Sequence, residues 1–279
     1  MKRIIVMAVA IVSIFTYACK KEETTPVSET AGLKKVQEMA NDTNTVEIYT
    51  TSGALQLGYN DVYLRIRDNA TSEYAKDAAF DWMPLMHMMS MTHACPKSQV
   101  QKVAGKETLY KGYLVFQMPE NASERWTLQL KYQTGGNSFT VEDTVAVPNS
   151  TRKRVTVVTG TDSKKYIIAL VSPETPQVAV NDFKVGLFTM ENKMSFPVVK
   201  NFAIDIDPRM PSMGNHGSPN NENLSYQSAD SLYHGKLSLT MTGYWKINMM
   251  LKNADSDVLK GEAVTEENEA SSLFLEVEF

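Results

Sequence analysis

Methionine, histidine and cysteine side chains are concentrated in one short segment, residues 83–95. Its thirteen residues hold five methionines, two histidines and a cysteine. A sparser phrase of the same kind runs over residues 210–216. Thioether, imidazole and thiolate groups are soft or borderline donors, which favour Cu(I) over the hard cations that carboxylates bind. The two phrases therefore predict a copper-binding protein, with Cu(I) as the expected state of the metal.

The positions of the histidines favour metal binding over core packing as the role of these phrases. Methionine also fills irregular cores and forms adaptable contact surfaces, which is the competing interpretation of the cluster. Three of the four histidines in the chain nevertheless fall inside the two methionine phrases. Scattered core methionines would not recruit histidine in this way, so metal binding is the favoured hypothesis for both phrases.

Each phrase supplies a candidate ligand set. We expect the first site to use Met88, Met91 and His93, and the second to use Met210, Met213 and His216. Two further candidates end a strand phrase that is shared by both halves of the chain: Met118 and Met241. Proline is confined to edge strands, strand ends or bulges, so Pro84 and Pro211 predict that the donors lie where the backbone can bend.

Two residues of the first phrase have two interpretations each. Cys95 is either a thiolate ligand two residues from His93 or a small buried residue, and Ser218 stands in its place in the second phrase. His87 either adds an imidazole to the site or is a solvated loop residue.

The N-terminus has the layout of an export signal. Lys2 and Arg3 precede an apolar run, and Ala18-Cys19 resembles a bacterial lipobox. We expect a lipoprotein signal peptide over residues 1–18, a lipid anchor on Cys19 and a disordered tether over residues 19–45, which is polar and rich in Thr, Glu and Ser. The alternative is an ordinary signal peptide cut nearby. The expected location is the cell envelope, as an outer-membrane lipoprotein facing the periplasm or the cell surface.

The charge and the cysteine content bear on which ligands the chain could bind. The net charge of -4 gives no footprint for nucleic-acid binding. After Cys19 only Cys95 remains, so no disulfide can form within the body of the chain, and a lone exported thiol is consistent with metal ligation. A body of this size is natural for two domains.

An internal repeat supports two similar domains. When His93 is aligned with His216, the phrase LYKGYLVFQM, which begins at Leu109, falls on LYHGKLSLTM, which begins at Leu232, without a gap. Further on, WTLQL from Trp126 matches WKINM from Trp245, and Asn60-Asp61 matches Asn181-Asp182 upstream.

The repeated phrases alternate apolar and polar residues between turn-forming clusters, as half-buried strands do. We therefore predict an all-β protein with two tandem immunoglobulin-like antiparallel β-sandwich domains, over residues 46–148 and 152–279. The aromatic side chains Tyr110, Trp126, Tyr233 and Trp245 are expected in the cores.

The order of these motifs resembles a known family. Asn-Asp before a strand, then M-P-x-M-x-x-H-x-x-P, then Y-x-G-x-L-x-L-x-M-x-G-x-W is similar to the YtkA-like and FixH-like domains, small exported β-sandwiches associated with copper. The second copy matches closely from Met210 to Trp245. The first copy departs from the pattern, with Met88 and Met89 at the places of Met210 and Pro211, a shorter spacing from Met91 to His93, and no glycine before Trp126.

These observations predict an exported, lipid-anchored metallochaperone-like protein that buffers Cu(I) or passes it to an oxidase or efflux partner. Its expected contacts are the membrane, through Cys19, and a copper-donating or copper-receiving protein. The alternative is a structural or adhesive lipoprotein that binds a protein or glycan without metal, the methionines forming a contact patch. Zinc as the bound metal is a third, smaller possibility. No enzyme is expected, because the chain has no nucleophile phrase, zincin motif or phosphate-cradling glycine loop.

Overall fold

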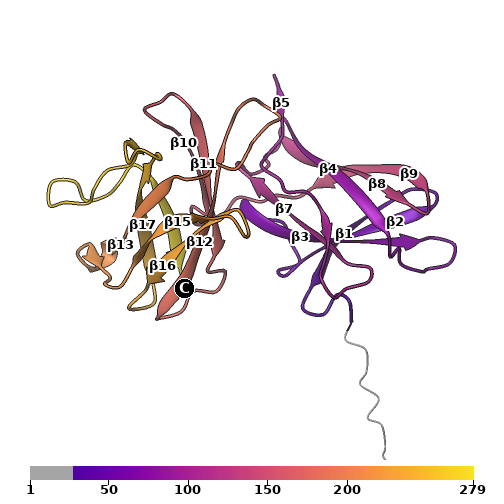
Figure 1. Cartoon of the computed structure of the whole chain (residues 1–279), viewed down its shortest axis with the longest axis horizontal. Coiled ribbons are helices and arrows are strands. Elements are labelled where there is room, and N and C mark those ends of the chain that lie inside the picture. Colours follow the sequence, from indigo (N-terminus) through magenta and orange to yellow (C-terminus); the bar gives the residue numbers. More distant parts are fainter. Residues whose placement is uncertain (1–27) are drawn as a thin grey trace, which may run out of the picture.

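The computed structural model describes residues 28–279, which form two immunoglobulin-like β-sandwiches lying side by side (Figure 1). The predicted signal peptide, Cys19 and the first part of the predicted tether lie outside the described residues. The predicted all-β fold class is confirmed, because the described elements are antiparallel strands apart from one short 3-10 turn, η1 (Pro211–Met213). No helix in the described range is long and apolar enough to span a membrane.

The first sandwich consists of two facing antiparallel sheets. Its strands are β1 (Lys34–Ala40), β2 (Asn44–Thr50), β3 (Gly58–Asp68), β4 (Ala78–His87), β5 (Thr92–His93), β6 (Gln101–Lys102), β7 (Tyr110–Phe116), β8 (Arg125–Thr134) and β9 (Asn137–Val145). One sheet has the order β1-β2-β3-β7-β6 and the other β5-β4-β8-β9. Alternate residues of both sheets point inward and form one core around Trp82, Trp126 and Phe116.

The second sandwich folds one continuous sheet around its core. Its strands are β10 (Val155–Thr159), β11 (Lys165–Ser172), β12 (Val180–Thr189), β13 (Ala203–Met210), β14 (His216–Gly217), β15 (Glu222–Gln227), β16 (Leu232–Ser238), β17 (Tyr244–Lys252), β18 (Val258–Lys260) and β19 (Phe274–Glu278). Because β15 pairs with both β16 and β13, the two layers are joined, whereas they stay separate in the first sandwich. Trp245, Phe183 and Tyr233 lie in the core.

Part of the predicted tether is folded, so the prediction of disorder was wrong over residues 34–45. These residues form β1 and the start of β2, which pair antiparallel from Lys34–Thr50 to Ala40–Thr45. Only Met39 of β1 is buried, and four of its seven residues are Lys, Gln or Glu, as suits an edge strand. Low hydrophobicity therefore concealed a strand that is stabilised mainly by its ladder to β2.

The strand registers confirm the internal repeat. Asn60 of β3 lies opposite Leu114 of β7, and Asn181 of β12 lies opposite Leu237 of β16, as in the sequence alignment. Both asparagines also make the same contacts. The Asn60 side chain accepts a hydrogen bond from the backbone N–H of Gln56 at 2.9 Å and donates to its carbonyl at 2.8 Å, and Asn181 does the same with Gln177 at 3.0 and 2.9 Å.

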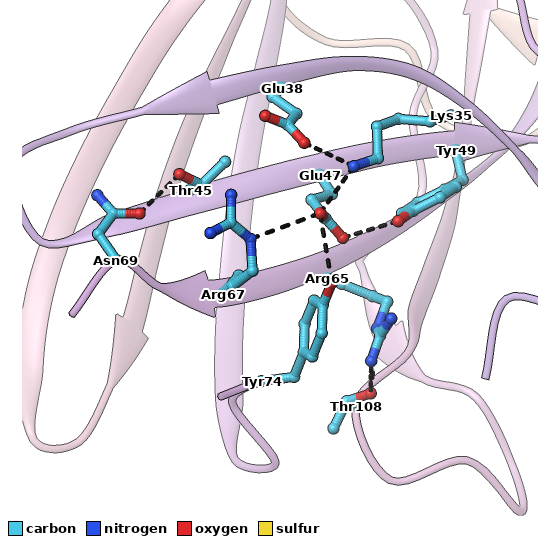
Figure 2. A network of polar contacts seen from close by, with 10 residues as sticks. All are labelled: Lys35, Glu38, Thr45, Glu47, Tyr49, Arg65, Arg67, Asn69, Tyr74 and Thr108. Carbon is cyan, nitrogen blue, oxygen red and sulfur yellow. Dashed lines mark hydrogen bonds and ion pairs between the residues drawn. The ribbon is translucent and has the colours of Figure 1, made fainter. Parts of the chain in front are cut away.

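A buried carboxylate, that of Glu47, joins side chains of neighbouring segments on the outer face of the first sandwich. The side chain of Glu47 is 3% exposed and accepts hydrogen bonds from Lys35 Nζ at 2.8 Å, Tyr49 Oη at 2.7 Å and Tyr74 Oη at 3.4 Å, with Arg67 Nε at 3.7 Å (Figure 2). Burial alone would raise the pKa of Glu47, but the hydrogen bonds from Lys35 and Tyr49 outweigh it and lower the pKa. Glu47 is therefore ionised in the folded protein.

The lowered pKa of Glu47 predicts acid sensitivity. A carboxyl group whose pKa is lower in the folded state stabilises the fold above the pKa of the unfolded chain, and this contribution is lost as the pH falls through the folded-state pKa. Glu47→Gln should lower the free energy of unfolding at pH 7 by about 1–3 kcal/mol, because buried donors lose their charged acceptor. Urea unfolding from pH 7 to pH 3 should show a weaker pH dependence in Glu47→Gln than in the native chain. Equal slopes in the two proteins would contradict this role.

Candidate functional site

The candidate site lies at one end of each sandwich, where a short edge strand brings a histidine beside a buried methionine. In the first sandwich His93 of β5 pairs with Met86 of β4. In the second, His216 of β14 pairs with Met210 of β13. Directly opposed residues of an antiparallel pair point to the same side of the sheet, with Cβ atoms about 5 Å apart. Each repeat therefore places one thioether and one imidazole next to each other.

In both repeats a tryptophan positions a second methionine near this pair. The indole N–H of Trp126 donates to the Met118 carbonyl at 3.0 Å, and that of Trp245 donates to the Met241 carbonyl at 3.0 Å. Trp126 lies opposite Met86, and His93 meets the Trp126 ring edge-on with 5.7 Å between ring centroids. The tryptophan thus holds the backbone of the second methionine near the histidine and methionine pair.

The registers correct the alignment of the first phrase. Pro84 precedes Met86 by two residues as Pro208 precedes Met210, and Met86 pairs with Trp126 in the place where β13 continues to Met210 beside Trp245. Met86, rather than the expected Met88, is thus the counterpart of Met210. The alignment was shifted by two residues because the segment from Met86 to His93 is one residue longer than the segment from Met210 to His216 and contains extra methionines.

The expected ligands divide into buried and exposed groups. Met210 belongs to a hydrophobic core, as does Met86, which was not among the expected ligands, and Met88, Met118 and Met241 are partly buried against the cores. Met91 and Met213 are exposed, as is His216, whereas His93 is half-buried. A Cβ atom at Gly243 would lie 3.2 Å from Met210 Cε, so this glycine leaves room for the buried thioether.

The imidazoles are partly engaged by the protein. His93 Nδ1 lies 2.8 Å from the Ala94 carbonyl oxygen, which leaves Nε2 available. His87 ends β4 directly after Met86, so its side chain leaves the opposite face of the strand, where Nε2 lies 2.9 Å from Thr127 Oγ1. Over residues 28–279 no group of three or more His, Cys, Asp or Glu side chains is arranged to hold a metal ion.

Cys95 is a buried thiol. It is 2% exposed, packs in the core of the first sandwich and forms no disulfide within the described chain. Burial raises the pKa of the Cys95 thiol far above its usual range, and a contact with the Val115 backbone offsets this only in part. Of the two interpretations of Cys95, the structure matches the small buried residue rather than a thiolate ligand.

Three exposed methionines lie on two loops that meet at the junction between the sandwiches. Met89 is 90% exposed, and Met91 and Met194 are 40% and 48% exposed. The loop after β12 comes next to β5, because the Ala94 N–H donates to the Lys193 carbonyl at 2.8 Å. We call Met89, Met91 and Met194 the methionine patch. Met194 was not among the expected site residues, because it stands alone in its own segment of the sequence.

Comparisons with known proteins give little further guidance. No family model and no curated protein matches the chain. Among solved structures, the FdeC adhesin of Escherichia coli is 13% identical with a TM-score of 0.24, over 80% of this chain and 64% of the adhesin chain. A titin fragment is 9% identical with a TM-score of 0.19, over 74% of this chain and 91% of the fragment. The chain thus spans less than two thirds of the adhesin chain, and similarities this weak carry no functional argument.

The burial of Cys95 predicts an unreactive thiol. At pH 8 a thiol-specific reagent such as iodoacetamide should modify native Cys95 at least tenfold more slowly than the urea-unfolded chain, because alkylation needs an exposed thiolate. Mass spectrometry of the mature chain gives the rate directly. Rapid alkylation of the folded protein would restore Cys95 as a candidate ligand.

Proposed function

We propose that this protein is a cell-envelope binding protein without enzymatic activity, whose paired sandwiches present the methionine patch to a partner protein and need no metal to do so. The membrane connection is a lipid anchor at Cys19. In this role the fold is a rigid support, and the contact chemistry is that of exposed thioethers. A structural or adhesive function of this kind was the alternative expected from the sequence.

The exposure of the methionine patch carries this proposal. An apolar side chain that is 90% exposed, as Met89 is, gains nothing from its position in the isolated chain. Methionine is flexible and polarizable, so it can adapt to partner surfaces of different shape. The three side chains of the patch come from both sandwiches and lie on loops, where binding residues commonly occur.

A hydrophobic junction between the two sandwiches holds the loops of the patch in place. Val115 of the first sandwich packs against Ile167 and Phe188 of the second, and the rings of Tyr113 and Phe188 have centroids 6.0 Å apart. Strands β3 and β11 are in contact across this junction (Figure 1). The loops that carry the patch are therefore held in a fixed relation, which lowers the entropy cost of binding a partner.

The burial of the soft donors argues for the metal-free version. Met86 and Met210, which lie beside the histidines, are packed in the hydrophobic cores, and Cys95 is a neutral thiol in the folded protein. A copper site at these positions would have to draw a thioether out of a close-packed core.

A copper carrier is the second candidate, and one observation favours it. The same trio of a strand methionine, an opposed histidine and a methionine bound through its carbonyl to tryptophan occurs in both repeats. The donor set fits a soft monovalent ion. In this version Met86, His93 and Met118 hold one ion, and Met210, His216 and Met241 hold the other.

Site-specific crosslinking tests the contact surface. A photo-crosslinking amino acid at Met89 should give a discrete adduct in cells that make the full-length protein at its normal level. The same group at Ser138, an exposed residue of β9, is the control and should give none. Met91→Ser with Met194→Ser should reduce the Met89 adduct at least fivefold. Equal adducts from both positions, or none from Met89, would contradict a partner at the patch.

Anaerobic Cu(I) titration separates the two candidates. A ligand that binds only the folded state raises the melting temperature, and a hundredfold excess over Kd contributes about 2.7 kcal/mol. The metal-free proposal expects no such rise in the full-length protein. The copper candidate expects a rise that is lost in part in His216→Ala and unchanged in His234→Ala, whose imidazole contacts Asp230 away from the site. A rise that depends on His216 would replace our first proposal with the second.

A further inference from the structure

The two sandwiches meet through two unlike surfaces. The first sandwich contributes what we call the junction surface, and the second contributes what we call the receiving face. The junction surface consists of Leu57, Tyr59, Tyr113 and Val115. The receiving face lies on the outer side of β10, β11 and β12 and consists of Val155, Ile167, Ala169 and Phe188. A contact between unlike surfaces of similar domains is head-to-tail, and such contacts can continue from one domain to the next.

In the first sandwich, the counterpart of the receiving face is polar. Ile48 lies opposite Leu64 as Leu170 lies opposite Val185, and these pairs are equivalent in the repeat. Stepping along the strands from these pairs, Thr45, Glu47 and Arg67 occupy the places of Ile167, Ala169 and Phe188. Figure 2 shows all three: Glu47 is the buried carboxylate, Arg67 lies beside it, and Thr45 donates to Asn69. This face therefore carries polar contacts where the second sandwich carries apolar side chains. The first sandwich therefore offers no receiving face.

In the second sandwich, two apolar residues at the counterpart of the junction surface are uncovered. Asn181 is equivalent to Asn60, so Val178 and Val180 occupy the places of Leu57 and Tyr59. These valines are 54% and 51% exposed, whereas Leu57 and Tyr59 pack against the junction. Lys236 takes the place of Tyr113 and is held beside them by Asp182, at 2.6 Å. Ser238, at the place of Val115, is buried and donates its backbone N–H to Asn221 Oδ1 at 2.8 Å. The apolar part that nothing in the described chain covers is therefore Val178 and Val180.

We propose that Val178 and Val180 form a docking surface for an immunoglobulin-like sandwich of a partner protein, which presents an apolar outer sheet face of the receiving type. The internal junction is the template for this contact, because equivalent residues of the first sandwich already make it. An aromatic side chain of the partner at the place of Phe188 would lie beneath the Lys236 ammonium group, a favourable cation–π arrangement.

A second copy of the chain is excluded as the occupant. Its own receiving face is covered by its first sandwich, and the corresponding face of the first sandwich carries the Glu47 network. The docking surface is separate from the methionine patch, so this inference goes beyond the proposed function and neither depends on the other.

Two sets of substitutions would each give the full-length chain an exposed receiving face, so that one copy could act as the partner of another. Tyr59→Glu with Tyr113→Glu places charge in the internal junction and frees the receiving face of the second sandwich. In a separate protein, Thr45→Ile, Glu47→Ala and Arg67→Phe recreate a receiving face on the first sandwich. The native chain should sediment as a monomer up to about 100 µM, a usual range for weak association. The altered proteins should associate as their concentration rises.

The valines decide whether the association is the proposed one. Val178→Glu with Val180→Glu, added to either altered protein, should return it to a monomer, whereas Val258→Glu, at an exposed valine of β18, should not. Circular dichroism and a cooperative melt verify that each protein is folded. The proposal is overturned if both altered proteins stay monomeric, or if either one's association persists after the valines are charged.

Discussion

The pairing register of β3 with β7, and of β12 with β16, is the constraint on which the other features depend. Because side chains alternate between the faces of a strand, a slip of one residue would exchange the core face for the outer face. Asn60 and Asn181 shape the start of each strand by bonding to the backbone of Gln56 and Gln177, and Asn181 also donates to the Leu237 carbonyl of β16 at 3.3 Å. Given that register, Tyr59 and Tyr113 must point outward to the junction while Val62 and Leu114 point into the core.

The same register places the soft donors where they serve packing first. Met86 and Met210 fill the ends of the two cores next to Trp126 and Trp245. A core at native density loses free energy when a large side chain is withdrawn, so a metal would have to offset that loss. The histidines opposite these methionines lie at the edge of the core, and this combination of buried thioether and accessible imidazole is why copper remains the second candidate.

The features that the sequence predicted correctly are those that leave a periodic pattern or a repeat in it. The all-β class, the repeat from Asn60 to Trp126, and the burial of both repeat tryptophans follow from alternation and spacing, and the structure agrees. Strand β1 was missed because an edge strand with one buried residue has little hydrophobic signal. Met88 was aligned with Met210 because a local motif match cannot detect that His93 pairs with Met86, one residue further back than His216 pairs with Met210. The Glu47 network and Met194 join segments distant in sequence, which no local pattern reveals.

The contrast between Glu47 and its counterpart Ala169 shows how a repeat can be ended. If both repeats carried an apolar receiving face and an apolar junction surface, copies of the chain would join head-to-tail without closure. Repeat proteins avoid this with terminal units whose outer face is polar. The Glu47 carboxylate does so at one end, and because it is satisfied by Lys35, Tyr49 and Tyr74, burying it under a partner would break bonds without replacing them. At the other end the ion pair beside Val178 and Val180, Lys236 with Asp182, is exposed rather than buried, so a partner sandwich could cover the valines without breaking a buried network.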